Sequence, residues 1–172
     1  MATARLFVAV WPPDDVVALL AALDRPEVVG LRWTPQPHWH VTLRFLGRAD
    51  VDDARRALGD LIVPEAPVVA VVGPVVGRFG QRVLQVPVSG LDGLAAAVVR
   101  ATAGVGEPPD DRPFAGHVTL ARASLAARVD LGRLTGQTIA GSWSVTEVSL
   151  VESRLSSAGA TYEEVERRSL TT

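Results

Sequence analysis

The tetrapeptide His-Val-Thr-Leu occurs twice in the chain, at residues 40–43 and 117–120, and the two copies contain two of its three histidines. Both copies lie in apolar runs that predict β-strands. Successive side chains of a strand point to opposite faces, so the histidine and the threonine of one copy share a face. The sequence therefore predicts two matched pairs, His40 with Thr42 and His117 with Thr119.

Two such pairs can catalyse displacement at a phosphodiester. The reaction needs a base that takes a proton from the attacking water and an acid that protonates the leaving oxygen. Because the pKa of histidine is about 6.5, one imidazole can be neutral and the other protonated near pH 7. Threonine hydroxyls can donate hydrogen bonds to the non-bridging oxygens, and neither a metal nor a cofactor is required. The spacing does not say which histidine is the acid.

The third histidine allows a different interpretation. His38 has the same strand parity as His40, and these two with His117 could form a zinc site with one open position. That arrangement leaves both threonines without a role. We therefore expect no metal, and we expect His38 to lie at the rim of the site.

Composition excludes several classes of function. The chain has 172 residues, a formal net charge of -2 and no basic run, so it has no broad footprint for duplex nucleic acid. It contains no cysteine and no lysine, which excludes thiolate nucleophiles, Schiff-base lysines and P-loop lysines. We find no apolar run of about 18 residues and no signal-peptide pattern, so we expect a cytoplasmic protein that does not bind membranes.

Hydrophobic spacing predicts strands and helices around both motifs. In the first half we expect strands at 5–10, 40–46 and 68–72, a helix from Asp14, and a second helix capped by Asp50 or Asp52. In the second half we expect a hairpin of 75–76 and 83–88 turning at 77–80, a helix from a Ser89/Asp92 capping box to about residue 103, a strand at 116–121, a short helix at 130–134, and strands at 139–151 and 162–170.

These elements predict an α+β fold in a single domain, 1–172. The motif strand follows a strand and a helix in each half, and no disordered linker separates the halves. We therefore expect two tightly packed, pseudo-symmetric lobes, approximately 1–73 and 74–172, with exchange of the terminal strands between them allowed. Each lobe is expected to contain an antiparallel-rich sheet with helices on its outer face.

Several segments of the chain resemble the two-histidine phosphoesterases. They are residues 5–12, 32–33, 39–47, 114–122 and 150–155, followed by Gly159 and Tyr162. Within that superfamily they are most similar to the RNA 2',3'-cyclic phosphodiesterase family, also called 2'-5' RNA ligase-like. The resemblance runs from residue 5 to about residue 170, and one departure is Gly116, where the family usually has proline.

The resemblance implies a duplicated fold whose motif strands face each other across a central cleft. It implies that His40 is the proton donor, that His117 is the proton acceptor, and that Thr42, Thr119 and Arg122 bind the phosphate. The implied activity is metal-independent hydrolysis of 2',3'-cyclic phosphate ends of RNA or oligonucleotides to 2'-phosphomonoesters, by a monomer. Reversible 2'-5' ligation, cyclic nucleotide opening and a non-catalytic RNA-end-binding module remain open as alternatives.

Strand parity disagrees with the resemblance about the arginine. Arg122 lies five residues after His117 and faces away from it in a regular strand, unless the strand ends or bulges there. Arg44 has the parity of the first histidine and is a second candidate, at the rim of the cleft. The same parity places Trp39 and Phe45 in the core.

Overall fold

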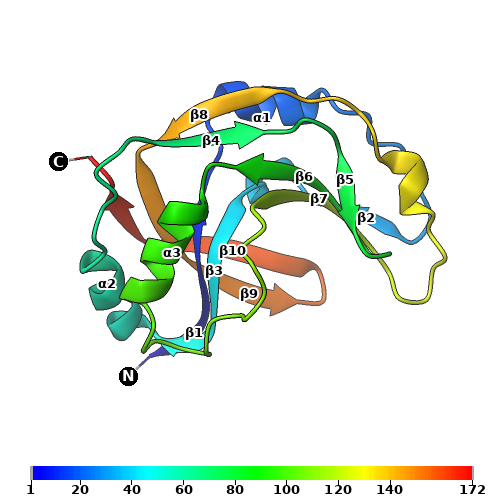
Figure 1. The fold of residues 1–172 in the computed structure, drawn as a ribbon. Helices are drawn as coiled ribbons and strands as arrows, with labels where there is room; N and C mark the ends of the chain where they lie inside the picture. The colour runs from blue at the N-terminus through cyan, green and yellow to red at the C-terminus, as the bar shows by residue number, and fades with distance from the viewer. Residues whose placement is uncertain (1, 172) are drawn as a thin grey trace.

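The computed structural model describes residues 2–171, and within them it has a single sheet, three α-helices and two 3₁₀ helices (Figure 1). The strands are β1 (Thr3–Val10), β2 (Leu31–Trp33), β3 (Val41–Asp50), β4 (Val68–Val72), β5 (Gly77–Phe79), β6 (Val83–Ser89), β7 (His117–Ala123), β8 (Gly141–Val145), β9 (Glu147–Ser156) and β10 (Gly159–Ser169). The helices are α1 (Asp14–Ala21), α2 (Val51–Gly59) and α3 (Asp92–Ala101), with 3₁₀ helices η1 (Gln36–His38) and η2 (Leu131–Leu134). This is the predicted α+β class.

The sheet places the two motif strands beside each other at its centre. Its order is β10-β9-β1-β3-β7-β6-β4-β8, with β2 added to β7 and β5 added to β6, and every pairing is antiparallel. Strand β9 lies between β10 and β1, whereas β4 lies between β6 and β8. Because one sheet runs through both halves, a division into two lobes stays a prediction.

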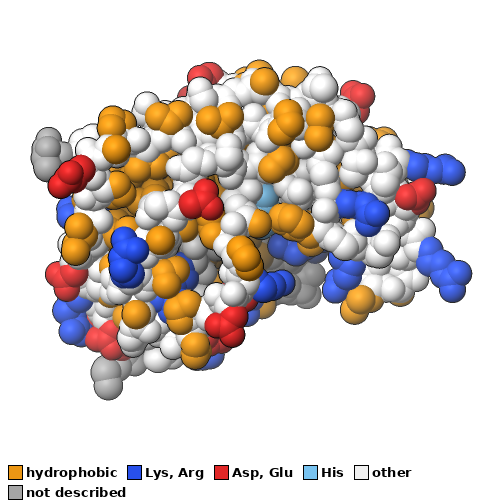
Figure 2. All heavy atoms as spheres, in the orientation of Figure 1, with side chains coloured by type: hydrophobic (Ala, Val, Ile, Leu, Met, Phe, Trp, Pro, Cys, Tyr) orange, Lys and Arg blue, Asp and Glu red, His pale blue; other side chains and the backbone are white. Residues whose placement is uncertain are grey.

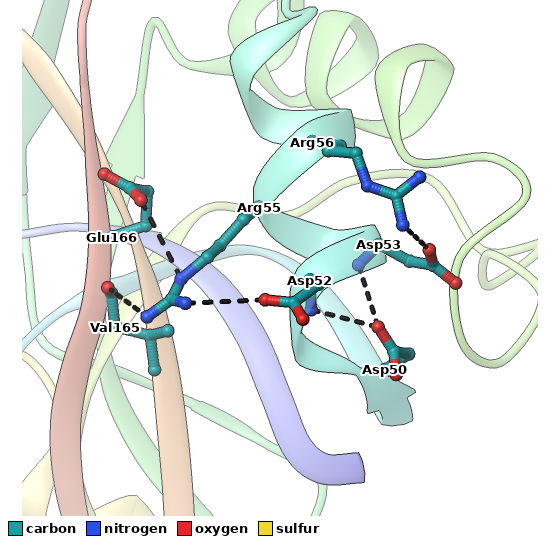
Figure 3. A network of polar contacts seen from close by, with 7 residues as sticks. All are labelled: Asp50, Asp52, Asp53, Arg55, Arg56, Val165 and Glu166. Atoms are coloured by element: carbon teal, nitrogen blue, oxygen red, sulfur yellow. Dashed lines mark hydrogen bonds and ion pairs between the residues drawn. The ribbon is translucent and has the colours of Figure 1, made fainter. Parts of the chain in front are cut away.

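Helix α2 shows how the sequence fixes an element boundary. Asp50 Oδ1 accepts hydrogen bonds from the backbone N–H groups of Asp52 and Asp53, each at 3.0 Å, so Asp50 is the cap. Arg55 then contacts the carboxylates of Asp52 at 3.5 Å and of Glu166 on β10 at 3.8 Å (Figure 3). At this end of the molecule, where α2 and α3 pack together, the α2 arginines Arg55 and Arg56 are paired with carboxylates (Figures 1 and 3).

Three predicted elements differ from the structure. The expected turn at 77–80 is largely strand β5, and the chain turns at Gly80, whose φ is +55°. Helix α3 has Leu91 as its cap and no capping box, because Ser89 belongs to β6 and is paired with Val71. The long strand expected at 139–151 is divided, because β8 pairs with β4 whereas β9 pairs with β1.

The hydrophobic core includes residues in and directly before the motif strands. Trp39, which directly precedes the first histidine, is 2% exposed, and its predicted place in the core is confirmed. Val41 and Val118, inside the two motifs, are completely buried. No helix within residues 2–171 is long and apolar enough to cross a membrane.

Candidate active site

Each motif strand contains a β-bulge directly after its threonine. In β7 the pairing with β6 shifts by one residue between Thr119 and Ala121, so Leu120 has no partner on β6. A bulge of this kind reverses the alternation of side chains along the strand. Leu120 and Ala121 are both buried as a result, and Arg122 faces the same side as His117. The structure therefore places Arg122 in the same cavity as His117, although regular strand parity predicts that it faces away.

The first motif repeats this bulge at the same step. In β3 the pairing with β1 shifts between Thr42 and Arg44, so Leu43 has no partner on β1. Leu43 and Arg44 are both buried, and Phe45 turns to the side of His40. The prediction that Phe45 lies in the core is wrong: its side chain is 40% exposed and lines the site.

The prediction that Arg44 lies at the cleft rim is also wrong. The bulge turns Arg44 into the protein, where it is 5% exposed. Its guanidinium donates hydrogen bonds to the carbonyl of Thr102, to the carbonyl of Val105 at 3.3 Å and to the carbonyl of Glu107 at 2.9 Å. Arg44 thus holds the loop that follows α3, and it is a structural residue.

The two motifs meet at one residue pair, Val41 with Val118. In an antiparallel pair, the residue before one partner lies opposite the residue after the other. Each histidine is therefore opposite the threonine of the other motif. All four side chains emerge on one face, across the junction of the two strands.

The side chains on this face line one cavity of about 260 Å³. Its lining residues are Arg5, Phe7, Thr34, His38, His40, Thr42, Phe45, His117, Thr119, Arg122, Ser153 and Tyr162. Figure 2 shows a histidine side chain in a hollow on this face, with arginine side chains nearby. Among the described residues, arginine and histidine but no carboxylate line this cavity. The cavity is therefore suited to an anion.

Both imidazoles are held in the same way. The Nδ1 atom of His40 is 2.7 Å from the carbonyl oxygen of His38, and that of His117 is 2.7 Å from the carbonyl oxygen of Ala115. A carbonyl oxygen only accepts, so Nδ1 carries the proton in each neutral ring and Nε2 is left for chemistry. His40 Nε2 is 3.0 Å from Thr42 Oγ1.

Aromatic side chains restrict the orientation of both rings. Phe7 lies with its ring centroid 5.0 Å from that of His40, and Tyr162 meets the same imidazole edge-on at 5.3 Å. Phe79 meets His117 edge-on at 4.7 Å. These distances are typical of stabilising aromatic pairs, so the imidazoles are held in fixed positions before any ligand binds.

The surroundings of both histidines disfavour their protonated forms. The pKa of His40 is lowered to about 4, chiefly by burial; the hydrogen bond to His38 acts in the opposite direction, and the charges of His117, His38 and Arg122 contribute to the lowering. Burial also lowers the pKa of His117; its bond to Ala115 raises the value and the charge of Arg122 lowers it. A phosphate between the imidazoles would supply the opposite charge and raise both pKa values.

His38 also lines the cavity, with its ring centroid 4.5 Å from that of Tyr162. Among residues 2–171, no group of three His, Asp or Glu side chains is placed to hold a metal ion. His38 therefore does not form a ligand set with His40 and His117. Its carbonyl instead orients the His40 ring.

Comparison with known proteins identifies related folds. Residues 10–74 match the family described as LigT like Phosphoesterase. The chain is 33% identical to TT0787 of Thermus thermophilus, with a TM-score of 0.79, and the match covers 96% of this chain and 97% of that one. No curated protein sequence matches the chain.

Two structures of LigT from E. coli are also similar over their full length. The structure complexed with 3'-AMP is 26% identical, with a TM-score of 0.74, and the match covers 99% of this chain and 100% of that one. The structure complexed with phosphate is 25% identical, with a TM-score of 0.70 and complete coverage of both chains.

Regular strand alternation predicts the wrong face for both Arg44 and Arg122, and an experiment can distinguish their roles. Arg122→Gln should weaken binding of inorganic phosphate by about 10 to 100-fold, because a charge-assisted hydrogen bond is lost, and should leave the melting temperature nearly unchanged. Arg44→Met should leave phosphate binding nearly unchanged in the folded protein. It should lower the free energy of unfolding by about 2–4 kcal/mol, because three carbonyls lose their hydrogen-bond donor. Calorimetry and thermal unfolding measure both effects. An Arg44→Met variant that kept its stability but lost phosphate would contradict these assignments.

The low pKa of His40 predicts a loss of stability in acid. The unfolded chain binds a proton at a pKa of about 6.5 and the folded chain at about 4, so the free energy of unfolding should fall as pH decreases through this interval. The contribution is at most about 3 kcal/mol. In His40→Gln that pH dependence should be reduced, and histidine NMR titration should show the pKa of His40 rising when phosphate is added. Titration of His40 near pH 6.5 without phosphate would disprove this.

Proposed function

The chain belongs to the two-histidine phosphoesterase superfamily as a LigT-like phosphoesterase, and from this premise we propose that it hydrolyses 2',3'-cyclic phosphate ends of RNA to 2'-phosphomonoesters. One observation carries the proposal. The two His/Thr pairs lie on the same face across the Val41–Val118 junction and line one cavity that contains Arg122. An anion bound in this cavity would have an imidazole from each motif within its surroundings, which supports the proposed two-histidine reaction.

The proposed reaction uses the Nε2 atoms of both histidines. His117 takes a proton from a water molecule as its oxygen attacks phosphorus, and the bond from phosphorus to the ribose 3'-oxygen breaks. His40 gives its Nε2 proton to that oxygen, which leaves a 3'-hydroxyl and a 2'-phosphomonoester. Arg122, Thr42 and Thr119 donate hydrogen bonds to the non-bridging oxygens, where charge develops.

The proton donor must be charged when the substrate is bound. The pKa of His40 is about 4 in the structure, because burial and the neighbouring cations disfavour its protonated form. A cyclic phosphodiester brings a negative charge into this site and offsets part of that repulsion. Substrate binding and protonation of His40 are therefore coupled, so the proton is present when the leaving oxygen needs it.

The solved relatives support a nucleotide phosphate as the ligand. LigT from E. coli has been crystallised with 3'-AMP and with phosphate, and the present chain covers its full length. These complexes agree with a cavity that is lined, within residues 2–171, by arginine and histidine and by no carboxylate. The assignment of the 3'-oxygen as the leaving group comes from the resemblance to the RNA cyclic phosphodiesterases, since residue spacing does not orient the ribose.

Removing either histidine should abolish most of the turnover. His40→Ala and His117→Ala should each reduce kcat on a 2',3'-cyclic phosphate oligonucleotide by about 10² to 10⁴-fold, without multiplying in the double variant. Thr42→Val and Thr119→Val should lose at most about 10³-fold, since each removes one hydrogen bond. Phosphorus NMR of the parental product should show a 2'-phosphate end.

Three outcomes would refute parts of this account. Near-parental kcat in either histidine variant would exclude the two-histidine mechanism. A 3'-phosphate product would keep the chemistry but remove the chain from the cyclic phosphodiesterase family. Tight binding of the cyclic phosphate without any product would favour an RNA-end-binding module over an enzyme.

Chelation provides a separate test of the zinc alternative. Activity should persist in EDTA, and kcat/KM should fall on both sides of a pH optimum, because one imidazole must be neutral and the other charged. His38→Ala should change KM modestly, since the backbone carbonyl that orients His40 remains. Loss of activity in EDTA with recovery on addition of zinc would overturn the metal-independent mechanism.

A further inference from the structure

Arg32 lies on the cavity side of the sheet, next to the proposed phosphate site. In the pairing of β2 with β7, Arg32 is directly opposite Arg122. Directly opposite residues of an antiparallel pair present their side chains on the same face. Thr34, two residues further along and on the same face by strand alternation, lines the cavity itself. Arg32 therefore lies beside Arg122 on the face of the sheet that carries the cavity, just outside the residues that line it.

Two arginines directly opposite each other on one face of a sheet repel. Within residues 2–171, neither Arg32 nor Arg122 forms an ion pair with a carboxylate. The contrast with α2 is clear, where Arg55 and Arg56 both reach carboxylates (Figure 3). Like charges opposite each other in a sheet are destabilising, so this pair points to an anionic ligand.

The guanidinium of Arg32 is held in place by the turn between β9 and β10. Its Nη2 donates to the carbonyl oxygen of Ala158 at 2.8 Å. Gly159, with φ of +113°, makes room for it, since a Cβ atom there would lie 2.6 Å from Nη2. Ser153 and Tyr162 of the same hairpin line the cavity. A guanidinium has five N–H donors, so most of those on Arg32 stay available to a ligand at the cavity edge.

We propose that Arg32 binds a second phosphate, the one a single nucleotide upstream of the cyclic phosphate. This inference rests on the proposed function and narrows its substrate to an oligonucleotide end instead of a mononucleotide. The cyclic phosphate carries one negative charge, which Arg122 and a protonated imidazole neutralise. Arg32 is then a further cation on the same face, and the next phosphate of the RNA chain is the anion suited to it.

The test compares a 2',3'-cyclic mononucleotide with a dinucleotide that ends in the same cyclic nucleotide. The parental protein should prefer the dinucleotide, and Arg32→Gln should lower the ratio of the two kcat/KM values by about tenfold. Arg32→Lys should retain part of the preference because it keeps the charge. Arg56→Gln, which removes an exposed arginine on α2, is the matched control and should leave the ratio unchanged.

Binding of an inert ligand separates this subsite from the proposed reaction. The probe is a deoxydinucleotide 3'-phosphate, which has the upstream phosphate but no 2'-hydroxyl. For Arg32→Gln, the slope of log Kd against log salt should decrease by about 0.7, the value for one phosphate of a single strand. If the parental protein hydrolyses neither cyclic substrate, the proposed function is refuted. The salt slope would still show whether Arg32 contacts the upstream phosphate.

Two results would overturn the role of Arg32. One is an unchanged ratio and an unchanged salt slope in Arg32→Gln. The other is an equal loss on both cyclic substrates, which would place Arg32 at the reacting phosphate or in the support of the β9–β10 turn.

Discussion

The two motif strands touch at a single residue pair, Val41 with Val118, and the relative positions of the two histidines and the two threonines follow from that contact. Antiparallel pairing at this point sets each histidine opposite the threonine of the other motif. The strands pair with different neighbours, β3 with β1 and β7 with β6, so one short contact joins two larger parts of the sheet. The cavity lies over this contact and receives matching groups from both sides.

The distribution of charge then determines what this cavity can hold. The chain carries a net charge of -2, but no carboxylate of the described residues lines the cavity. Burial and neighbouring cations lower the pKa values of both imidazoles. An anion bound between them would raise these pKa values again. Carboxylates are instead paired with arginines elsewhere, as between α2 and β10.

The sequence predicted which residues meet at the site better than it predicted how the strands orient them. The repeated tetrapeptide identified His40 and His117 because rare residues recurred in matching strands, and the structure brings them into one cavity. Strand alternation failed for Arg44 and Phe45, since a bulge reverses the faces and apolar patterning does not reveal it. Arg122 could be placed only by resemblance, for the same reason. Burial of Trp39 followed directly from its place before the motif.

A structure with bound phosphate or a nucleotide tests the central claim most directly, because that claim concerns two imidazoles and one phosphorus. We predict that one phosphate lies over the Val41–Val118 junction, with the Nε2 atoms of His40 and His117 on opposite sides of it. Each should be about 3 Å from an oxygen of that phosphate. A phosphate that contacts one imidazole only, or that binds outside this cavity, would contradict the account.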